Sequence, residues 1–319
     1  MSSHYLGIDV GNTKLAFGMA KADGMSFCEK RVVPTEPHLG VEQALQKIFD
    51  NTKDLLATVP DVQGIGIAFG GFVDASRTIG LASPNFPGLK NVALVDMIQE
   101  LAPGVPVRMD NDANVAGIGE AVYGKARGYH MAIYLTVSTG IGGAVLVDGK
   151  PLAGSQGLAG EFGHMIVKPG GPRCTCGSQG CLESIASGTS IARIARERGM
   201  QTSTRIHSPF SGVEEINARI VFEAADRGDR LAKDVVEEVA YYLGIGLANV
   251  ISAFDPDIVI LGGGVMNSAE LLLPPAIRVV EKHLGARGAQ VPPIEASSIH
   301  DDVALWGAMA LARFAVGEE

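Results

Sequence analysis

The strongest constraint on the fold is a strand, a glycine turn and a returning strand that occur twice in the chain. In the first copy, Tyr5–Val10 and Leu15–Ala20 are apolar strand patterns on either side of the turn Gly11–Thr13. The second copy spans Met131–Val147 and turns through Gly140. We interpret the two copies as a weak internal duplication, with a chance likeness between two apolar hairpins as the alternative. A duplication predicts two related α/β lobes that face each other across a cleft.

The two copies also set the expected domains. At an offset of 129 residues Tyr5-Leu6 falls on Tyr134-Leu135, and Gly11 falls on Gly140. The predicted lobes are residues 1–115, to which a final helix at about 302–319 returns, and residues 116–301, which include a metal-binding loop.

Hydrophobic periodicity predicts the elements that carry polar residues toward a site. They are a helix at about Val41–Leu56, strands at Gln63–Phe69 and Val105–Met109, a helix at Ala113–Tyr123, helices up to about Phe254, a strand at Ile258–Leu261 and a final helix at about Asp302–Phe314.

Composition narrows the function classes. The 319 residues are 46% hydrophobic and 19% charged, which is typical of a globular protein with a full core. No apolar segment approaches the roughly 20 residues that a membrane span needs, so we expect a cytoplasmic protein without a membrane partner. The net charge of −9 disfavours nucleic acid as a partner and favours small-molecule chemistry.

Three glycine-rich turns suggest a split nucleotide site. The first is Asp9–Lys14, where Gly11 lets backbone N–H groups approach a phosphate, Asp9 can orient hydrated Mg²⁺, and Thr13 and Lys14 add donors. The second is Ser138–Gly143, and the third, Gly262–Gly264, lies between a strand and a helix. A polar hairpin turn is the alternative for the first segment taken alone. The G-x-x-x-x-G-K-[ST] pattern of P-loop enzymes is absent.

The segment Asp110–Asn114 follows a strand and opens a helix, a position from which side chains reach a cleft. A carboxylate here can accept the proton of an attacking sugar hydroxyl, and Asn111 can bond its neighbour. The alternative is that one aspartate only caps the helix. Two aspartates and two asparagines in five residues exceed the needs of capping, so we expect a catalytic role.

One imidazole and three thiolates form the strongest single signal, because this is the ligand set of a closed, structural zinc site. They are His164, Cys174, Cys176 and Cys181. Free cysteines in a surface loop are the alternative. Glu161 and Glu183 flank the group and are placed to accept hydrogen bonds from sugar hydroxyls, or are ordinary surface glutamates.

Together these segments resemble the ROK (repressor, open reading frame, kinase) family of bacterial sugar kinases and sugar-responsive regulators, over nearly the whole chain. The motifs that carry the resemblance are Asp9–Lys14, Asn111–Asn114, Ser138–Gly143, Gly160–His164, and Cys174-x-Cys176-Gly177-x-x-Gly180-Cys181-x-Glu183. The resemblance implies an actin-like, ribonuclease-H-like fold of two lobes with ATP between them, and a homodimer.

The resemblance also implies roles for single residues. Asp112 would take the proton from a sugar hydroxyl, commonly O6, as it attacks the γ-phosphate of Mg-ATP. The sugar would be bound by Gly71, Asn85, Asn111, Glu161, His164 and Glu183, with His164 also on zinc. The ATP site would comprise Asp9, Gly11, Asn12, Thr13, Lys14, Thr139, Gly140 and Gly142, with the nucleoside near Gly263.

Two positions depart from the family pattern. Asn12 stands where a second glycine is usual, which costs little if the backbone angle suits Asn. Gly70-Gly71 stands where many members have Pro-Gly. Neither change removes a catalytic group.

The resemblance leaves a kinase, a DNA-binding regulator and a catalytically silent sugar sensor to be distinguished. Regulators of the family carry a helix-turn-helix domain ahead of the first phosphate motif, whereas eight residues precede Asp9 here, so we expect a kinase. Glu161 and Asn114 are similar to glucose-type and N-acetylglucosamine-type members. We favour glucose as the substrate over N-acetylglucosamine, fructose, mannose or allose.

Overall fold

The computed structural model describes residues 3–21, 26–59, 61–83, 86, 88–201, 215–286, 288–299 and 302–317. The chain divides into two compact units. The first comprises residues 1–130, 144–159 and 301–319, and the second comprises residues 131–143 and 160–300.

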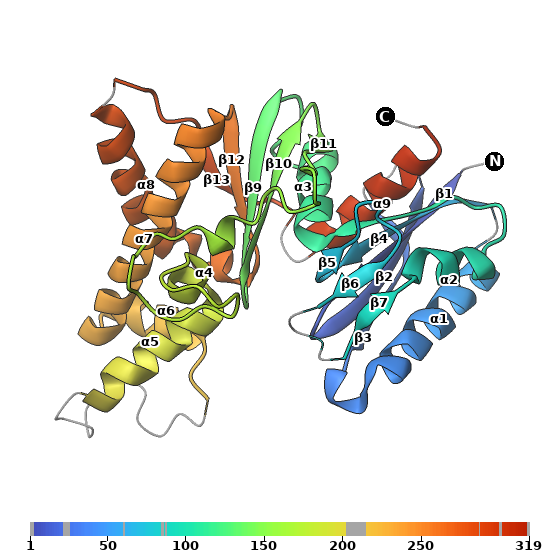
Figure 1. Cartoon of the computed structure of the whole chain (residues 1–319), viewed down its shortest axis with the longest axis horizontal. Helices are drawn as coiled ribbons and strands as arrows, with labels where there is room; N and C mark the ends of the chain where they lie inside the picture. The colour runs from blue at the N-terminus through green and yellow to red at the C-terminus, as the bar shows by residue number, and fades with distance from the viewer. Residues whose placement is uncertain are drawn as a thin grey trace. The chain divides into compact units, whose positions relative to one another are not determined.

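The core of the first unit is a five-stranded sheet. Its strand order is β3 (Phe27–Pro34), β2 (Lys14–Lys21), β1 (His4–Val10), β4 (Val62–Phe69) and β8 (Val107–Asn111). Figure 1 labels β1 to β4 of this sheet. β1 is antiparallel to β2 and parallel to β4, and β4 is parallel to β8. The carboxyl ends of these three parallel strands therefore lie at one edge of the sheet.

Alternate residues of β1 face two different layers of helices. Leu6 and Ile8 are fully buried in the core that includes Ile48 of α1 (Val41–Thr58) and Ile98 of α2 (Leu94–Leu101). A Cβ on Gly7, which points to the other face, would lie 2.9 Å from the Leu305 carbonyl oxygen of α9 (Val303–Ala315).

The face toward α9 is lined by glycine, which allows the helix backbone to touch the sheet. A Cβ on Gly66 of β4 would overlap the carbonyl oxygen of Ala308, and one on Gly64 would lie 2.5 Å from that of Ala312. On the helix itself, a Cβ on Gly307 would overlap the Val115 carbonyl of α3 (Asp112–Tyr123). Because glycine has no side chain at these positions, the backbone of α9 can pack directly against this sheet and against α3.

A small sheet of β5 (Phe72–Val73), β6 (Gly80–Ala82) and β7 (Lys90–Val92) was not expected from the sequence. Strands of two or three residues are too short to show periodicity. β8 also ends two residues later than predicted, because Asn111 pairs with Phe69 at the end of β4.

The sheet associated with the second unit repeats the strand order of the first. It runs β11 (Lys150–Pro151), β10 (Ile141–Val147), β9 (Met131–Val137), β12 (Ile258–Gly262) and β13 (Ile294–Ala296), with β9, β12 and β13 mutually parallel. β1 ends at Val10 and β9 at Val137, an offset of 127 residues. The repeat of topology supports a duplication, but the offset of 129 is wrong by two residues.

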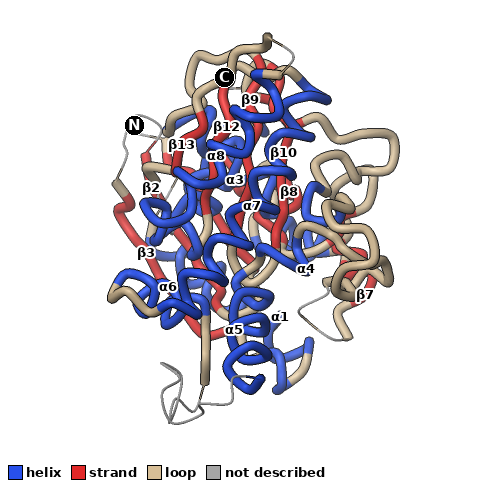
Figure 2. The backbone as a smooth tube through the Cα atoms, turned by 90° about the vertical axis from the view of Figure 1, so that its left-hand side faces the viewer, coloured by secondary structure: helices blue, strands red, loops and turns tan. Residues whose placement is uncertain are grey.

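Helices of the second unit surround α7 (Arg230–Phe254), which contacts α5 (Gly188–Gln201), α6 (Ala218–Asp226) and α8 (Ala269–Gly285) (Figure 2). Among the described residues, α7 is the one helix long and apolar enough to cross a membrane by length and composition. Its apolar window is 61% buried inside the protein, as is usual for a core helix. The sequence predicted helices up to about Phe254 but no single long apolar helix in this region.

We expect Gly66→Ala to lower the free energy of unfolding by at least about 2 kcal/mol, because the added methyl group meets backbone that cannot rotate away. Urea unfolding measures the change. The matched control is Gly285→Ala at the end of α8, where a Cβ meets nothing within 4 Å. The control should shift stability by less than about 0.5 kcal/mol. Equal stability of the two variants would contradict the backbone contact between α9 and β4.

Candidate active site

Thr35 fixes the turn after β1 through two hydrogen bonds. The Thr35 Oγ1 donates to the Gly11 carbonyl at 2.7 Å, and its N–H donates to the Thr13 carbonyl at 3.1 Å. Gly11 closes the turn by donating to the Lys14 carbonyl at 3.1 Å. Asn12 has no positive φ, so the position does not require the glycine that is usual in the resembled family.

Asp9 lies at the end of β1 in an unfavourable place for a negative charge. Burial, and then the nearby Asp112 carboxylate, raise the pKa of Asp9 from 3.8 to about 7, although Lys14 opposes the shift. Two neighbouring carboxylates repel each other when both are ionised, and a bound cation offsets this repulsion. Asp9 and Asp112 therefore form a donor set suited to Mg²⁺, which takes carboxylate and water oxygens.

Asn111 is the N-cap residue of α3, and the Asp112 Oδ1 also accepts from the Ala113 N–H, at 2.9 Å. The Asn111 Oδ1 accepts from the Ala113 N–H at 3.0 Å, and its Nδ2 donates to the Gly71 carbonyl at 2.9 Å. Asp112 is the first residue of the helix, with one carboxylate oxygen 3.8 Å from where a Cβ on Gly70 would lie. Both Gly70 and Gly71 thus lie beside the Asn111-Asp112 pair.

The buried carboxylate of Asp110 fixes the point at which β8 ends and α3 begins. Asp110 is 1% exposed, and its Oδ1 accepts from the Asn111 N–H at 2.8 Å and from the Asn114 Nδ2 at 3.0 Å. Burial raises the pKa of Asp110, while Asn114 and Arg77 partly offset the shift. The Arg77 Nε lies 3.2 Å from the Asp110 Oδ2. No sequence signal pointed to Arg77, because it lies on a loop between two very short strands.

In the second unit, the turn Ser138–Gly140 is tied to the segment that follows the cysteines. The Gly188 N–H donates to the Ser138 carbonyl at 2.7 Å, and the Thr189 Oγ1 donates to the Thr139 carbonyl at 2.9 Å. The Glu183 Oε2 accepts from the Ile141 N–H at 2.9 Å.

Glycine at position 140 leaves room for the Glu183 carboxylate, because a Cβ there would lie 2.5 Å from its Oε2. Gly142, one residue further along the chain than Ile141, lies in β10.

A cavity of about 700 Å³ opens beside this turn, wholly within the second unit. Ser138 and Thr139 line one part and Gly264 another. Gly263, with φ +88°, precedes that lining residue, and a Cβ there would lie 2.5 Å from the Val137 carbonyl. Lining residues that no sequence motif indicated lie on α5, α6 and the 3-10 helix η4 (Gly264–Ser268), among them Thr189, Arg196, Phe222, Asn267 and Ser268.

Glu161 precedes a short 3-10 turn, η2 (Phe162–His164), which ends at His164 and packs on β10. Gly163 makes this possible, because a Cβ there would overlap the Ile141 carbonyl. Burial raises the pKa of Glu161, with His164 lowering it and Glu183 raising it further. The structure therefore brings Glu161, His164 and Glu183 together.

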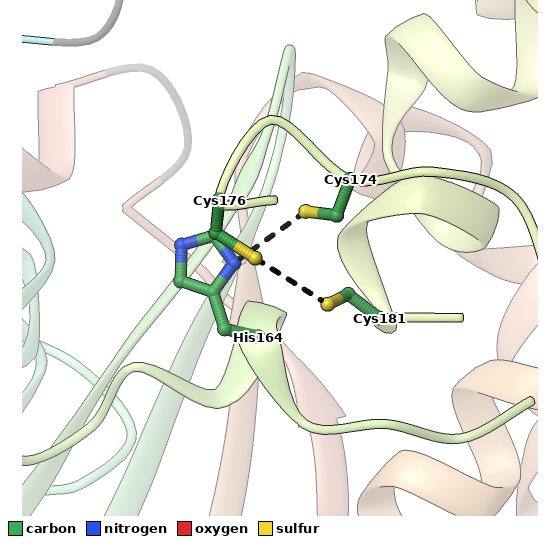
Figure 3. A group of neighbouring side chains, drawn as sticks. All are labelled: His164, Cys174, Cys176 and Cys181. Carbon is green, nitrogen blue, oxygen red and sulfur yellow. Dashed lines mark hydrogen bonds between the residues drawn. The ribbon is translucent and has the colours of Figure 1, made fainter. Parts of the chain in front are cut away.

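His164 and the three cysteines converge on one point (Figure 3). The His164 Nδ1 lies 3.7 Å from the Cys174 Sγ, and the Cys176 and Cys181 Sγ atoms lie 3.7 Å apart. Thiolates bound tetrahedrally at 2.3 Å from zinc lie about 3.8 Å from each other, so the group fits this metal. The four cysteines of the chain are all free of disulfides.

The other ring nitrogen of His164, Nε2, lies 3.7 Å from the Glu161 Oε2. A carboxylate at this place is the usual partner of a metal-bound histidine. Within each unit, the predicted residues therefore cluster as the motifs suggested. Asn85 is the exception, because it lies outside the described residues.

The model of the ROK family matches residues 5–315. The chain belongs to the ROK family. It is 33% identical over 313 residues to the glucokinase of Thermotoga maritima, covering 98% of each protein. It also resembles the crystal structure of a ROK family glucokinase from Streptomyces griseus in complex with glucose and AMPPNP. That comparison gives a TM-score of 0.84 and 34% identity, and covers 98% of this chain and 99% of the other.

A regulator of the ROK family also matches this chain. The xylose repressor of Caldicellulosiruptor bescii is 30% identical over 274 residues, which cover 85% of this chain and 68% of the repressor. The predicted family is confirmed, and so is the predicted fold, because the matching ROK sugar kinases have the actin-like ATPase architecture.

We expect Asp9→Asn to stabilise the Mg²⁺-free protein in a pH-dependent way. The pKa of Asp9 is about 7 in the folded protein and ordinarily 3.8, so folding becomes less favourable as pH rises between those values. Removing the carboxylate should therefore raise the free energy of unfolding at pH 8, by up to about 4 kcal/mol, and leave it nearly unchanged at pH 4.

Urea unfolding at the two pH values tests this expectation. The control is Asp50→Asn on the exposed face of α1, for which no such difference is expected. An equal effect of Asp9→Asn at pH 4 and pH 8 would exclude a raised pKa at Asp9.

Proposed function

We propose that this chain is a kinase that transfers the γ-phosphoryl group of Mg-ATP to a hexose hydroxyl, O6 of glucose. One observation carries the proposal. Asp112 is the first residue of α3, and it lies beside the N-cap residue Asn111 and the glycine pair Gly70-Gly71. The likeness to glucokinases over the whole chain supports it.

Asp112 acts as the general base. Its carboxylate accepts the proton of the sugar hydroxyl as that oxygen attacks the γ-phosphorus, and ADP leaves with the electrons of the broken P–O bond. The Ala113 N–H is shared between the Asn111 Oδ1 and the Asp112 Oδ1, so it keeps an acceptor when the Asp112 carboxylate bonds to the sugar. The buried Asp110 fixes the backbone of Asn111 and so the direction of both neighbours.

The two glycine turns hold the phosphates of ATP. In the first unit the donors are the N–H groups of Asn12 and Thr13, the Thr13 hydroxyl and the Lys14 ammonium. Gly11, whose own N–H is bonded to the Lys14 carbonyl, lets the phosphate approach the backbone. Thr139, Gly140 and Gly142 serve in the same way in the second unit. Bound Mg²⁺ would neutralise phosphate charge, and Asp9 is the residue that would orient its water shell.

The nucleoside of ATP enters the cavity of the second unit. Gly263 brings the chain close to β9 there, and its neighbour Gly264 lines the cavity. A volume of about 700 Å³ lies in the range of small-molecule sites.

Polar side chains and an amide orient the sugar. The Asn111 amide gives one N–H to the Gly71 carbonyl and keeps the other for a hydroxyl. Glu161, Glu183 and the Nε2 of His164 accept from or donate to the remaining hydroxyls, and Asn85 adds a further amide. Glucose is favoured over N-acetylglucosamine, fructose, mannose or allose because glucokinases recur among the relatives.

Zinc at the thiolate group would have a structural role. All four positions of a tetrahedral zinc would be filled by protein ligands, which leaves none for water. We further propose that the protein is a cytoplasmic homodimer that binds neither nucleic acid nor membrane. A sugar-responsive repressor is the alternative of a different class, in view of the similar xylose repressor.

We expect Asp112→Asn to retain sugar binding and to lose about 10²–10⁴-fold in kcat, because the amide cannot accept the proton. ADP release with Mg-ATP across a panel of hexoses and N-acetylhexosamines measures this loss and identifies the substrate. The matched control is Asp96→Asn, which changes another aspartate in the first turn of a helix. It should keep the wild-type rate.

Wild-type turnover by Asp112→Asn would remove the base assignment. No turnover on any sugar, together with a specific shift of duplex DNA, would establish the repressor instead.

We expect Cys176→Ser to lower zinc content and thermal stability together, because folding of a structural site is coupled to metal binding. Metal analysis and thermal unfolding of the purified protein measure both. Cys28→Ser, outside the metal-binding group, is the control and should change neither. A zinc-free variant with full stability would contradict a structural metal.

A further inference from the structure

Thr35 is a buried residue in close contact with the first phosphate turn. It directly follows β3, is 1% exposed, and lies far from the turn in sequence. Its side chain and its backbone each donate one hydrogen bond to the turn, to the carbonyls of Gly11 and Thr13. Thr35 belongs to none of the sequence motifs described above.

These two bonds determine which way the turn's N–H groups point. In a trans peptide the C=O and the following N–H point in opposite directions. Holding the Gly11 carbonyl toward Thr35 therefore turns the Asn12 N–H away from the protein interior. Within the described part of the chain this N–H has no acceptor, as expected for a donor kept for a ligand.

The second turn is also held by two donors, which there come from two neighbouring residues. There the Thr189 hydroxyl donates to the Thr139 carbonyl, and the Gly188 N–H donates to the Ser138 carbonyl. Thr189 lines the 700 Å³ cavity, so a change there would alter direct contacts as well. Thr35 is covered by protein, and a change at Thr35 reports on orientation alone.

We propose that Thr35 is a positioning residue for the phosphates of ATP, acting through the Gly11 carbonyl to present the Asn12 N–H. The inference rests on the proposed use of ATP. The Thr35 hydroxyl touches neither substrate, so its loss should weaken ATP binding and leave sugar binding intact. Without the hydroxyl the Gly11 carbonyl loses its partner, and the peptide between Gly11 and Asn12 can rotate.

The test compares Thr35→Val, which keeps shape but lacks the hydroxyl, with Thr35→Ser, which restores it. We expect Thr35→Val to raise the KM for ATP and the Kd for Mg-ADP by about 10-fold, with the KM for sugar changed less than 2-fold. Thr35→Ser should return both constants to within about 3-fold of wild type. If Thr35→Val does not fold, Thr35→Cys, whose thiol is a weak donor, takes its place.

The matched control is Thr52→Val. Thr52 of α1 is also fully buried, but its hydroxyl has no hydrogen-bond partner among the residues that the structure describes. This variant should leave both nucleotide constants unchanged.

Unchanged nucleotide constants in Thr35→Val, or an equal rise in the KM for sugar, would overturn the inference. Binding of Mg-ADP by calorimetry does not need turnover. Wild-type protein that binds Mg-ADP but phosphorylates no sugar would therefore refute the proposed function and still leave Thr35 testable.

Discussion

Parallel pairing of β1, β4 and β8 is the constraint on which the first half of the site depends. The register joins Val10 to Phe69 and Phe69 to Asn111, so the three strands end level with one another. The polar residues at or just beyond those ends are consequently gathered at one edge. Burial is the larger cause of the raised pKa of Asp9, and the register adds to it by bringing the Asp112 carboxylate near.

In the second unit, one carboxylate connects groups that the sequence separates. Glu183 accepts from the Ile141 N–H beside the glycine turn, and its other oxygen lies 3.5 Å from the Thr175 hydroxyl in the cysteine loop. His164 contributes Nδ1 to the thiolates and directs Nε2 toward Glu161. The loop, the turn and the two glutamates are thus joined through direct contacts, and a change in one should be felt by the others.

Motifs with fixed spacing could be predicted from the sequence, whereas contacts made by buried single residues could not. The hairpins, the helix after Asn111 and the zinc ligand set each carry a local pattern that depends on near neighbours. Thr35 and Arg77 carry no such pattern, because what matters is a tertiary contact with Gly11 or Asp110. The roles assigned to single site residues remain predictions.

The glycine face of the first sheet has a consequence for the order of folding. Its strands come from the first 111 residues, but the helix that covers Gly66 and Gly64 comes from residues 303–315. Domains generally fold as units, in the order in which they leave the ribosome. Here the second unit is complete in sequence by residue 300, before the first has received its last helix. The first sheet is therefore completed after the second unit, and its glycine-lined face stays open to solvent until residues 303–315 have been synthesised.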